Sequence, residues 1–544
     1  MEIGLRLIRR TNRSDPASVI LWICKEAVRG FLVTAIAILM TIPASPHETA
    51  QDLSSKSLED LMNVEVTSVS KTEQRLSRTA SAVFVITQED MRRSGATNIP
   101  DLLRMVPGVS VAQINANTWA ITTRGLNGRF SNELLVMLDG RSVYTPTFDG
   151  VRWDALDLPL EVIERIEVIR GPGASVWATN AVNGVINIIT KKASGTSGDM
   201  VVAGGGTIDQ GFGTLQYGGS IGKDTSYRVF TKYLNQDHFP GTNGQDGGDG
   251  WNFTRVGFRT DTVFSPKDTV TFEGDMYRGR EGTPGLSVTS ITSPAVEVQA
   301  QTNLGGGFLQ IVWDHTFSPT AGTSLQVSYN EYERNDALGE TEGTFDIAFQ
   351  HHFAWGNRQS LIWGVEFRDS NSRAVGSLLV SMDPANAGIQ MFSSFVQDEI
   401  VLVPDRLFLT AGTKVERSYS NGWDAQPSVR VAWTPTARQT LWAAISHADR
   451  TPSELDHFVV SNLGGFTGPN GPVALRLFGN LDLGNEQTNS YEAGYRTSLA
   501  DKLSLDFTAY YASQYDQETT EPGASFFEAA PAPPTSSCLW PTPT

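Results

Sequence analysis

The chain has 544 residues, 51 of them glycine, with a net charge of -17 and a mean hydropathy of -0.20. This hydropathy excludes a membrane protein built from apolar helices, whereas the glycine content suits an antiparallel β protein with many turns. The negative charge argues against nucleic-acid binding through phosphates. The two cysteines, Cys24 and Cys538, provide neither a disulfide framework nor a thiolate metal site.

The N-terminus has the pattern of an export signal. Several arginines and one lysine precede an uncharged apolar run from Phe31 to Ile42. This run is too short to cross a bilayer as a helix but has the length of a signal-peptide core. Pro43-Ala44-Ser45 offers small residues for cleavage, so we predict a signal peptide over residues 1–45. A membrane anchor is the alternative, disfavoured because no stretch reaches about 20 apolar residues.

Four short motifs follow one another between residues 102 and 190. The last consists of two β-branched runs joined by a link rich in Gly, Pro and Asn, with charges at period two in the first run. By themselves these runs predict two strands that meet at a tight connection, as in an ordinary α+β core. The motifs are Leu102-Leu103 with Val106-Pro107-Gly108-Val109, then Thr123-Arg124-Gly125, then Leu138-Asp139-Gly140, and finally Val162–Pro172 with Asn180–Thr190.

In this order the motifs resemble the plug domain of TonB-dependent outer-membrane receptors. The resemblance extends over residues 58–192 and implies a plug domain at 56–192. It further implies an α+β plug inside a transmembrane antiparallel β-barrel. The residues that carry the resemblance are Arg124, Gly125, Leu138, Asp139, Gly140, Glu164, Arg165, Glu167, Arg170, Gly171, Pro172, Asn180, Gly184 and Asn187.

A polar and β-branched segment precedes the plug, at the place where this family carries its TonB box. It reads Val64-Glu65-Val66-Thr67-Ser68-Val69-Ser70. An extended segment of this kind can add as a strand to the sheet edge of a partner. The resemblance implies that the partner is a TonB-type periplasmic protein that transmits energy.

Beyond residue 195, apolar and polar residues alternate. Leu361, Trp363, Val365 and Phe367 alternate with their neighbours, and the same pattern recurs around 270–276, 324–329 and 502–511. Each predicted strand therefore has one apolar face. That face would meet lipid in a membrane barrel or a second sheet in a soluble sandwich.

Connection lengths favour the barrel. Seven short links with turn residues alternate with longer loops at 235–252, 278–302 and 446–487. Short turns on one rim and long loops on the other are typical of outer-membrane barrels. The short links are Gly222-Lys223-Asp224, Ser265-Pro266-Lys267-Asp268, Ser318-Pro319-Thr320, Trp355-Gly356-Asn357, Val403-Pro404-Asp405, Thr434-Pro435-Thr436 and Ala500-Asp501-Lys502.

These turns predict an incomplete barrel over residues 196–517. They give about 15 strands, whereas plugged transporters have about 22. Residues 522–544 are rich in Pro, Ala, Thr and Ser and show no alternation, so we expect an irregular tail. We therefore expect a C-terminally truncated member of the family. A natural smaller barrel is the alternative, disfavoured because a plug of about 130 residues would not fit its lumen.

Other chemistry is sparse in the sequence. His351 and His352 alternate faces of a strand and cannot both point at one ligand. Gly204-Gly205-Gly206 is not followed by Gly-Lys-Ser/Thr and so matches no phosphate loop. No nucleophile, base and orienting acid occur in order. We predict no enzymatic activity, no metal site and no cofactor.

The resemblance implies a receptor in the cell outer membrane, in contact with lipid, that takes up a scarce small solute such as a siderophore, cobalamin or another metal chelate. Arg124 and Arg170, with Glu164 and Glu167, are candidates for ionic contacts between plug and barrel wall. Charge pairs within the plug are the alternative. A non-functional truncated receptor, a passive porin or adhesin-type barrel and a signal-transducing receptor are the rival functions, the last requiring a further domain before the plug.

Overall fold

The computed structural model describes most of the chain from residue 65 to residue 523. The predicted signal peptide and most of the predicted tail lie outside the described residues, as do Val64, Val69 and Ser70. Among the described residues, no helix has both the length and the apolar character needed to cross a membrane. The described ranges are 65–68, 71, 74–75, 78–125, 127–173, 175–177, 179–241, 244–287, 290, 296–418, 422–436, 438–468, 471–500 and 503–523.

The plug is built on a five-stranded sheet in the order β3-β10-β11-β6-β7. Strand β10 is antiparallel to both of its neighbours, and β11 is parallel to β6. The two predicted motif strands are therefore confirmed as β10 and β11, which pair in the middle of the sheet. The strands are β3 (Ala82–Thr87), β6 (Leu134–Leu138), β7 (Arg141–Ser142), β10 (Ile163–Arg170) and β11 (Gly184–Thr190).

Short helices and hairpins complete the plug. Helix α3 begins at a capping box, in which the Thr87 hydroxyl accepts from the Asp90 amide while the Asp90 carboxylate accepts from the Thr87 amide. Helix α4 begins after Asn98, whose side chain caps it. The remaining elements are β1 (Glu65–Val66), β2 (Gln74–Arg75), α3 (Gln88–Ser94), α4 (Ile99–Leu103), β4 (Val109–Asn115), β5 (Thr118–Thr123), β8 (Tyr144–Thr145), β9 (Gly150–Val151) and the 3-10 helices η3 (Leu160–Val162) and η4 (Ala193–Thr196).

Apolar side chains fill both faces of the plug sheet. Ile166 and Val168 of β10, and Ile186 and Ile188 of β11, are fully buried in one cluster with residues of α4 and β6. Val185 and Ile169 belong to a second cluster on the opposite face. Burial on both faces explains why these strands read as nearly continuous β-branched runs.

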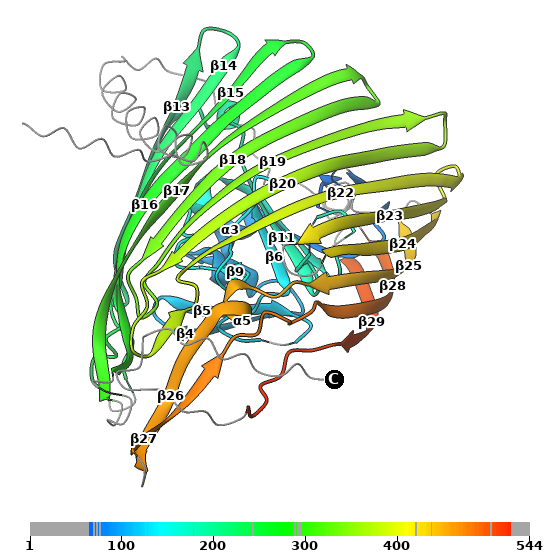
Figure 1. Ribbon diagram of the computed structural model, residues 1–544. Helices are drawn as coiled ribbons and strands as arrows, with labels where there is room; N and C mark the ends of the chain where they lie inside the picture. The colour runs from blue at the N-terminus through cyan, green and yellow to red at the C-terminus, as the bar shows by residue number, and fades with distance from the viewer. Residues whose placement is uncertain are drawn as a thin grey trace, which may run out of the picture. The chain divides into compact units, whose positions relative to one another are not determined.

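The second part of the fold is a 15-stranded antiparallel sheet that curves around the plug (Figure 1). The predicted number of strands is confirmed. Within the described residues, β12 and β29 each pair on one side only, so the barrel is not closed. Its strands are β12 (Gly198–Gly204), β13 (Asp209–Ile221), β14 (Thr225–Gln236), β15 (Trp251–Ser265), β16 (Asp268–Ser287), β17 (Val296–Ser318), β18 (Ala321–Arg334), β19 (Glu340–Trp355), β20 (Gln359–Ala374), β22 (Asn386–Val403), β23 (Leu407–Ser418), β24 (Gly422–Thr436), β25 (Gln439–Arg450), β28 (Glu486–Ala500) and β29 (Leu503–Tyr515).

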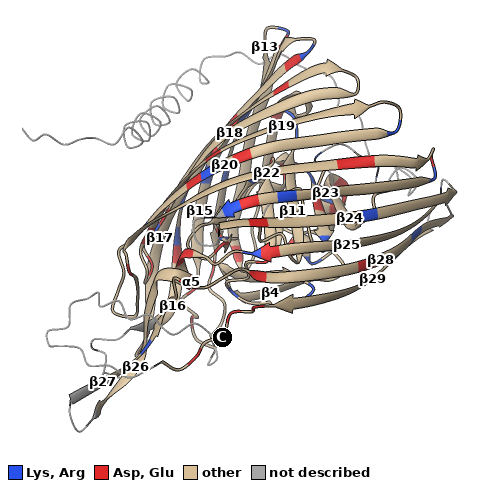
Figure 2. Cartoon of the chain, turned by 45° about the vertical axis from the view of Figure 1, so that its right-hand side comes forward, with Lys and Arg blue, Asp and Glu red and all other residues tan. Residues whose placement is uncertain are grey.

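The predicted alternation places apolar side chains outward. In β20, Trp363, Val365 and Phe367 are exposed, whereas Glu366 and Arg368, which alternate with them, take part in ion pairs. Acidic and basic residues lie near one another on neighbouring strands of this region (Figure 2). This pattern is that of a membrane barrel, in which the apolar face meets lipid and the polar face lines the lumen.

The connections agree with the predicted asymmetry, although some predicted links and loops prove to be strands. Six of the seven short links join successive strands, which defines a short-turn rim, and longer loops define a long-loop rim. The seventh, Thr434-Pro435-Thr436, is the last part of β24, and the turn to β25 follows it. The predicted loop at 278–302 is wrong, because β16 continues to Ser287 and β17 begins at Val296. These strands exceed the roughly 9–11 residues needed to cross a bilayer, so the hairpin continues as a paired ladder past the expected membrane edge. Residues 278–302 are rich in Gly and Thr, and for this reason the sequence predicted a loop and not two paired strands.

The predicted loop at 446–487 contains regular structure of its own. Helix α5 (Glu454–Phe458) is followed by the hairpin of β26 (Val459–Gly468) and β27 (Gly471–Phe478). Strand β21 (Val380–Met382), from another long loop, pairs with β26. Two loops of the long-loop rim are thus joined into one small sheet, seen beside the main sheet in Figure 1.

Candidate functional site

Arg124 joins the plug to the barrel wall. It follows β5, and its two terminal nitrogens lie 3.0 and 3.1 Å from the two carboxylate oxygens of Glu492 on β28. One of these nitrogens also donates to the carbonyl oxygen of Arg170 at 2.6 Å. The guanidinium lies 4.2 Å from the ring centroid of Tyr510 on β29. Both charged side chains are buried, so the predicted ionic contact of Arg124 with the barrel is confirmed.

Gly171 is packed against this ion pair. Its φ is +125°, and a Cβ at this position would lie 2.4 Å from a Glu492 oxygen and 2.8 Å from both terminal nitrogens of Arg124. A side chain there would therefore be strained and would also separate the two charges. The glycine of the Arg170-Gly171-Pro172 motif is explained by these two requirements.

We predict that Gly171→Ala lowers the unfolding free energy of the plug by about 2 kcal/mol. Gly95→Ala is the matched control, because Gly95 also has a positive φ, +74°, but a Cβ there would meet no atom within 4 Å. Denaturant titrations of both variants measure the difference. Equal losses would show that backbone strain alone, and not the ion pair, requires glycine at position 171.

The other three candidates for contacts with the wall make their hydrogen bonds within the plug. Arg165 pairs with Glu164 at 2.6 Å and with Glu167 at 2.8 Å, and Arg170 donates to the carbonyl oxygen of Pro107 at 2.9 Å. The predicted barrel contacts of Glu164 and Glu167 are therefore wrong, because their neighbours on both sides of β10 are strands of the plug itself. Arg170, at the end of β10, also interacts electrostatically with Asp506 on β29 and Glu492 on β28, so its predicted contact with the barrel is confirmed.

Other motif residues fix turns of the plug to its own strands or to the barrel. The Asp139 carboxylate accepts from the amide and hydroxyl of Thr190 at 2.8 and 2.9 Å, which ties the end of β6 to the end of β11. Asn180 accepts from the amide of Thr451, beyond the end of β25, at 3.0 Å. A Cβ on Gly184 would lie 2.5 Å from the carbonyl oxygen of Ile169. Of the other motif residues, Gly125, Leu138, Gly140 and Pro172 are sequence neighbours of Arg124, Asp139 and Gly171, and Asn187 lies on β11.

Several further ion pairs between plug and barrel escaped the sequence analysis. Lys232 on β14 lies 2.6 Å from Asp157, and Arg334 on β18 lies 2.5 Å from Asp154. Arg152 pairs with Glu340 on β19. The barrel partners occupy lumen-facing positions of strands that alternate with period two. The sequence therefore indicates that these charged residues face the lumen, but it does not indicate which plug residue each of them pairs with.

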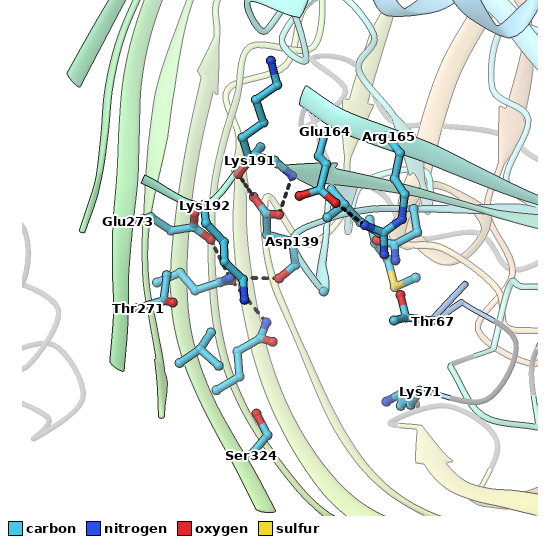
Figure 3. A pocket seen from close by; sticks show the side chains of 18 of the residues that line it. Thr67, Lys71, Asp139, Glu164, Arg165, Lys191, Lys192, Thr271, Glu273 and Ser324 are labelled. Carbon is cyan, nitrogen blue, oxygen red and sulfur yellow. Dashed lines mark hydrogen bonds and ion pairs between the residues drawn. The ribbon is translucent and has the colours of Figure 1, made fainter. Parts of the chain in front are cut away.

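A cavity of about 1520 Å³ separates the plug from the wall formed by β15 to β22. Its lining includes Asp139 and Glu164 of the plug and Thr271 and Glu273 of the wall. Figure 3 shows the wall residues on one side and Thr67 and Lys71 on the other. The lining holds eight basic and eight acidic residues, so the cavity favours neither sign of charge.

The predicted TonB-box segment lies against the plug. Strand β1 pairs with β2, Val66 is fully buried, and the amides of Thr67 and Ser68 donate to the Glu167 carboxylate. Lys71, just beyond the segment, is enclosed as well. Burial, followed by repulsion from Lys414, lowers the pKa of Lys71 to about 8.

Among the described residues, no group of three or more His, Cys, Asp and Glu side chains could hold a metal ion. The scattered histidines of the barrel make other contacts. His315 bonds Asp268 at 2.6 Å, and the His351 ring stacks on Phe353 at 5.1 Å.

An α+β plug held by buried ion pairs inside an antiparallel barrel sheet defines a plugged outer-membrane receptor. Two family profiles match the chain: the TonB-dependent receptor plug domain at residues 75–185, and the TonB-dependent receptor-like β-barrel at residues 203–535. The chain belongs to the TonB-dependent receptor family, whose members are receptors and transporters of the outer membrane.

Relatives with named functions share parts of the chain. The vitamin B12 transporter BtuB of Vibrio cholerae is 32% identical over 237 residues, which cover 43% of this chain and 34% of the relative. The ferric enterobactin receptor of Pseudomonas aeruginosa is 25% identical over 464 residues, 70% of this chain and 60% of the relative. The match thus spans about a third of the transporter and less than two thirds of the receptor.

Solved structures show the same fold. A crystal structure of the ferric enterobactin receptor PfeA from Pseudomonas aeruginosa has a TM-score of 0.66 at 19% identity, covering 80% of this chain and 71% of that one. The siderophore receptor PirA from the same organism has a TM-score of 0.60 at 20% identity, with 80% and 75% covered. Identities this low show the fold alone.

Proposed function

We propose that the chain is a receptor that takes up a scarce solute, such as a siderophore or cobalamin, with energy from a TonB-type periplasmic protein. One observation carries this proposal. Thr67 of the predicted TonB-box segment and the nearby Lys71 line the cavity between plug and barrel. A partner that pulls this segment away would therefore change the wall of the cavity through which a solute can pass.

The relatives and the charge of the cavity support this choice of solute. The functions named for the relatives are vitamin B12 transport and ferric enterobactin reception. The volume of about 1520 Å³ exceeds the roughly 300–1,000 Å³ of common small-molecule sites. Its balanced lining would offer partners to polar groups of either sign, as a chelate or a corrinoid carries.

The solute would first bind at the long-loop rim, where turns of the plug meet the loops of the barrel. Asn117 donates to the carbonyl oxygens of Asp249 and Gly282 in this region, both at 2.9 Å. Phe130, packed edge-on against Phe148 at 5.2 Å, is half exposed. This rim combines fixed polar groups with accessible aromatic surface, as small-molecule sites do.

Deletion of residues 64–70 tests the proposal. We expect the deleted chain to retain solute binding but lose uptake, because the segment engaged by the partner is gone. Radiolabelled cobalamin and ferric enterobactin are the probes, supplied to cells that lack other receptors for them. Arg78→Ala, which removes an exposed side chain just beyond the segment, is the control and should import normally. Undiminished import by the deleted chain would instead indicate a passive barrel.

A further inference from the structure

One carboxylate oxygen of the plug accepts three hydrogen bonds from the segment before it. The amides of Thr67 and Ser68 donate to Oε2 of Glu167 at 3.0 and 2.9 Å, and the Ser68 hydroxyl donates to the same oxygen at 2.5 Å. Glu167 lies in the middle of β10, and both its side chain and that of Ser68 are fully buried. Hydrogen bonds to an ionised, buried acceptor are stronger than neutral ones.

Neighbouring side chains orient this carboxylate and close the site. Arg165 donates from Nε to the other Glu167 oxygen, Oε1, at 2.8 Å, so Oε2 is left facing the segment. Asn187, the cross-strand partner of Glu167 on β11, donates to the Ser68 hydroxyl oxygen at 3.1 Å. The Trp177 ring nitrogen donates to the Ser68 carbonyl oxygen. Ser68 is therefore bonded through its amide, its hydroxyl and its carbonyl group.

The same segment is attached to the barrel a few residues later. The Lys71 ammonium lies 4.7 Å from the ring centroid of Trp177 in the plug and 4.6 Å from that of Phe395 on β22. Thr67 and Lys71 both line the large cavity, as Figure 3 shows. Displacement of the segment would thus remove part of the cavity wall as well as expose the segment.

We propose that Glu167 is the latch residue of this receptor: its carboxylate holds Thr67 and Ser68 on the plug sheet, and loss of these bonds frees the segment. Because three donors converge on one oxygen, these bonds are lost together when Glu167 turns or is neutralised. This role rests on the proposed function, in which the segment is the part that the periplasmic partner engages. Glu167 acts as a positioning residue and need not touch the solute.

A spin label on Thr67→Cys reports the state of the segment. The Thr67 side chain lines the cavity, and its backbone amide, which bonds Glu167, is retained in the variant. Cys24 and Cys538 are replaced by serine, and the full chain is purified in detergent. Electron paramagnetic resonance then gives the ratio of mobile to immobile label without any solute or partner.

We expect Glu167→Gln to raise this ratio about tenfold, because a charge-assisted acceptor is lost. Glu164→Gln is the matched control, since Glu164 lies on the same strand and pairs with the same Arg165 but has an exposed carboxylate, which makes no bond to the described residues of the segment. It should leave the ratio unchanged. An unchanged ratio in Glu167→Gln, with the fold intact by circular dichroism, would overturn the proposal.

Ser68→Ala provides a second route should the Glu167 variant fail to fold. It removes the hydroxyl bonds to Glu167 and Asn187 without altering the plug sheet, and a several-fold rise in mobile label is expected. No rise would count against the latch. The proposed function is tested separately, by solute uptake in the chain that lacks residues 64–70. If the label confirms the latch but the deleted chain still takes up solute, the proposed function is refuted and the latch stands. If the label shows no change but the deleted chain loses uptake, the latch is refuted and the proposed function stands.

Discussion

Arg124→Ala is expected to destabilise the plug within the barrel by about 3–5 kcal/mol, because it leaves the Glu492 carboxylate buried without a partner. The side chains of the pair are only 8% and 6% exposed, and the two bonds between them are parallel. The variant also removes the donor to the Arg170 carbonyl and the cation over Tyr510. Glu492→Ala should cost a similar amount, since it leaves the guanidinium unpaired.

Hydrogen exchange of the amides in β10 and β11 measures this loss as an opening free energy. The double variant of Arg124 and Glu492 should cost less than the sum of the two single changes, because neither charge is then left alone. Arg78→Ala serves as the control. Its pair with Asp405 has side chains 45% and 84% exposed, and such pairs contribute about 1 kcal/mol or less. Equal protection in Arg124→Ala and Arg78→Ala would contradict a structural role for the buried pair.

Local pattern was sufficient to predict much of the fold. The β-branched runs that became β10 and β11 are buried on both faces, so their composition followed directly from their place in the sheet. The period of two in β20 predicted which side chains face outward, because the pleat alternates strictly. Turn residues such as Pro266 and Pro319 marked the strand ends, and so the strand count could be made from the sequence.

Contacts between distant parts of the chain could not be predicted in this way. Arg124 and its partner Glu492 are 368 residues apart, and nothing near either residue indicates the other. Glu167 shows the opposite problem. Its motif was recognised and it was a candidate for contacts with the wall, but its carboxylate meets a segment 99 residues earlier. The partners of Arg124 and Glu167 both depend on which part of the chain packs against each face of the plug sheet. That packing is a property of the assembled fold and not of the local sequence.

Helix α5 gives rise to the last prediction, which concerns pH. The helix is attached to the plug by the amides of Glu454 and Leu455, which donate to the carbonyl oxygens of Pro146 and Thr147 at 3.3 and 2.9 Å. The Glu454 side chain is fully buried and accepts from the Ser372 hydroxyl on β20. Burial, with a smaller contribution from the nearby Glu340, raises the pKa of Glu454 to about 7, although the Ser372 bond opposes this rise.

We therefore expect α5 to detach from the plug more readily as the pH rises from about 4.5 to 7. The Glu454 carboxyl group has a higher pKa when α5 is docked than when it is detached, so protonation favours docking. Docking is therefore strongest at a pH below the pKa of the detached state, and it weakens as the pH rises to the pKa of the docked state. The total change is on the order of 3 kcal/mol. Hydrogen exchange of residues 453–458 at pH 5 and pH 8, corrected for intrinsic rates, measures it. Glu454→Gln should abolish the difference, whereas Glu297→Gln, which alters an exposed carboxylate on β17, should preserve it. A pH dependence that survives Glu454→Gln would assign the effect to another group and refute the role of Glu454.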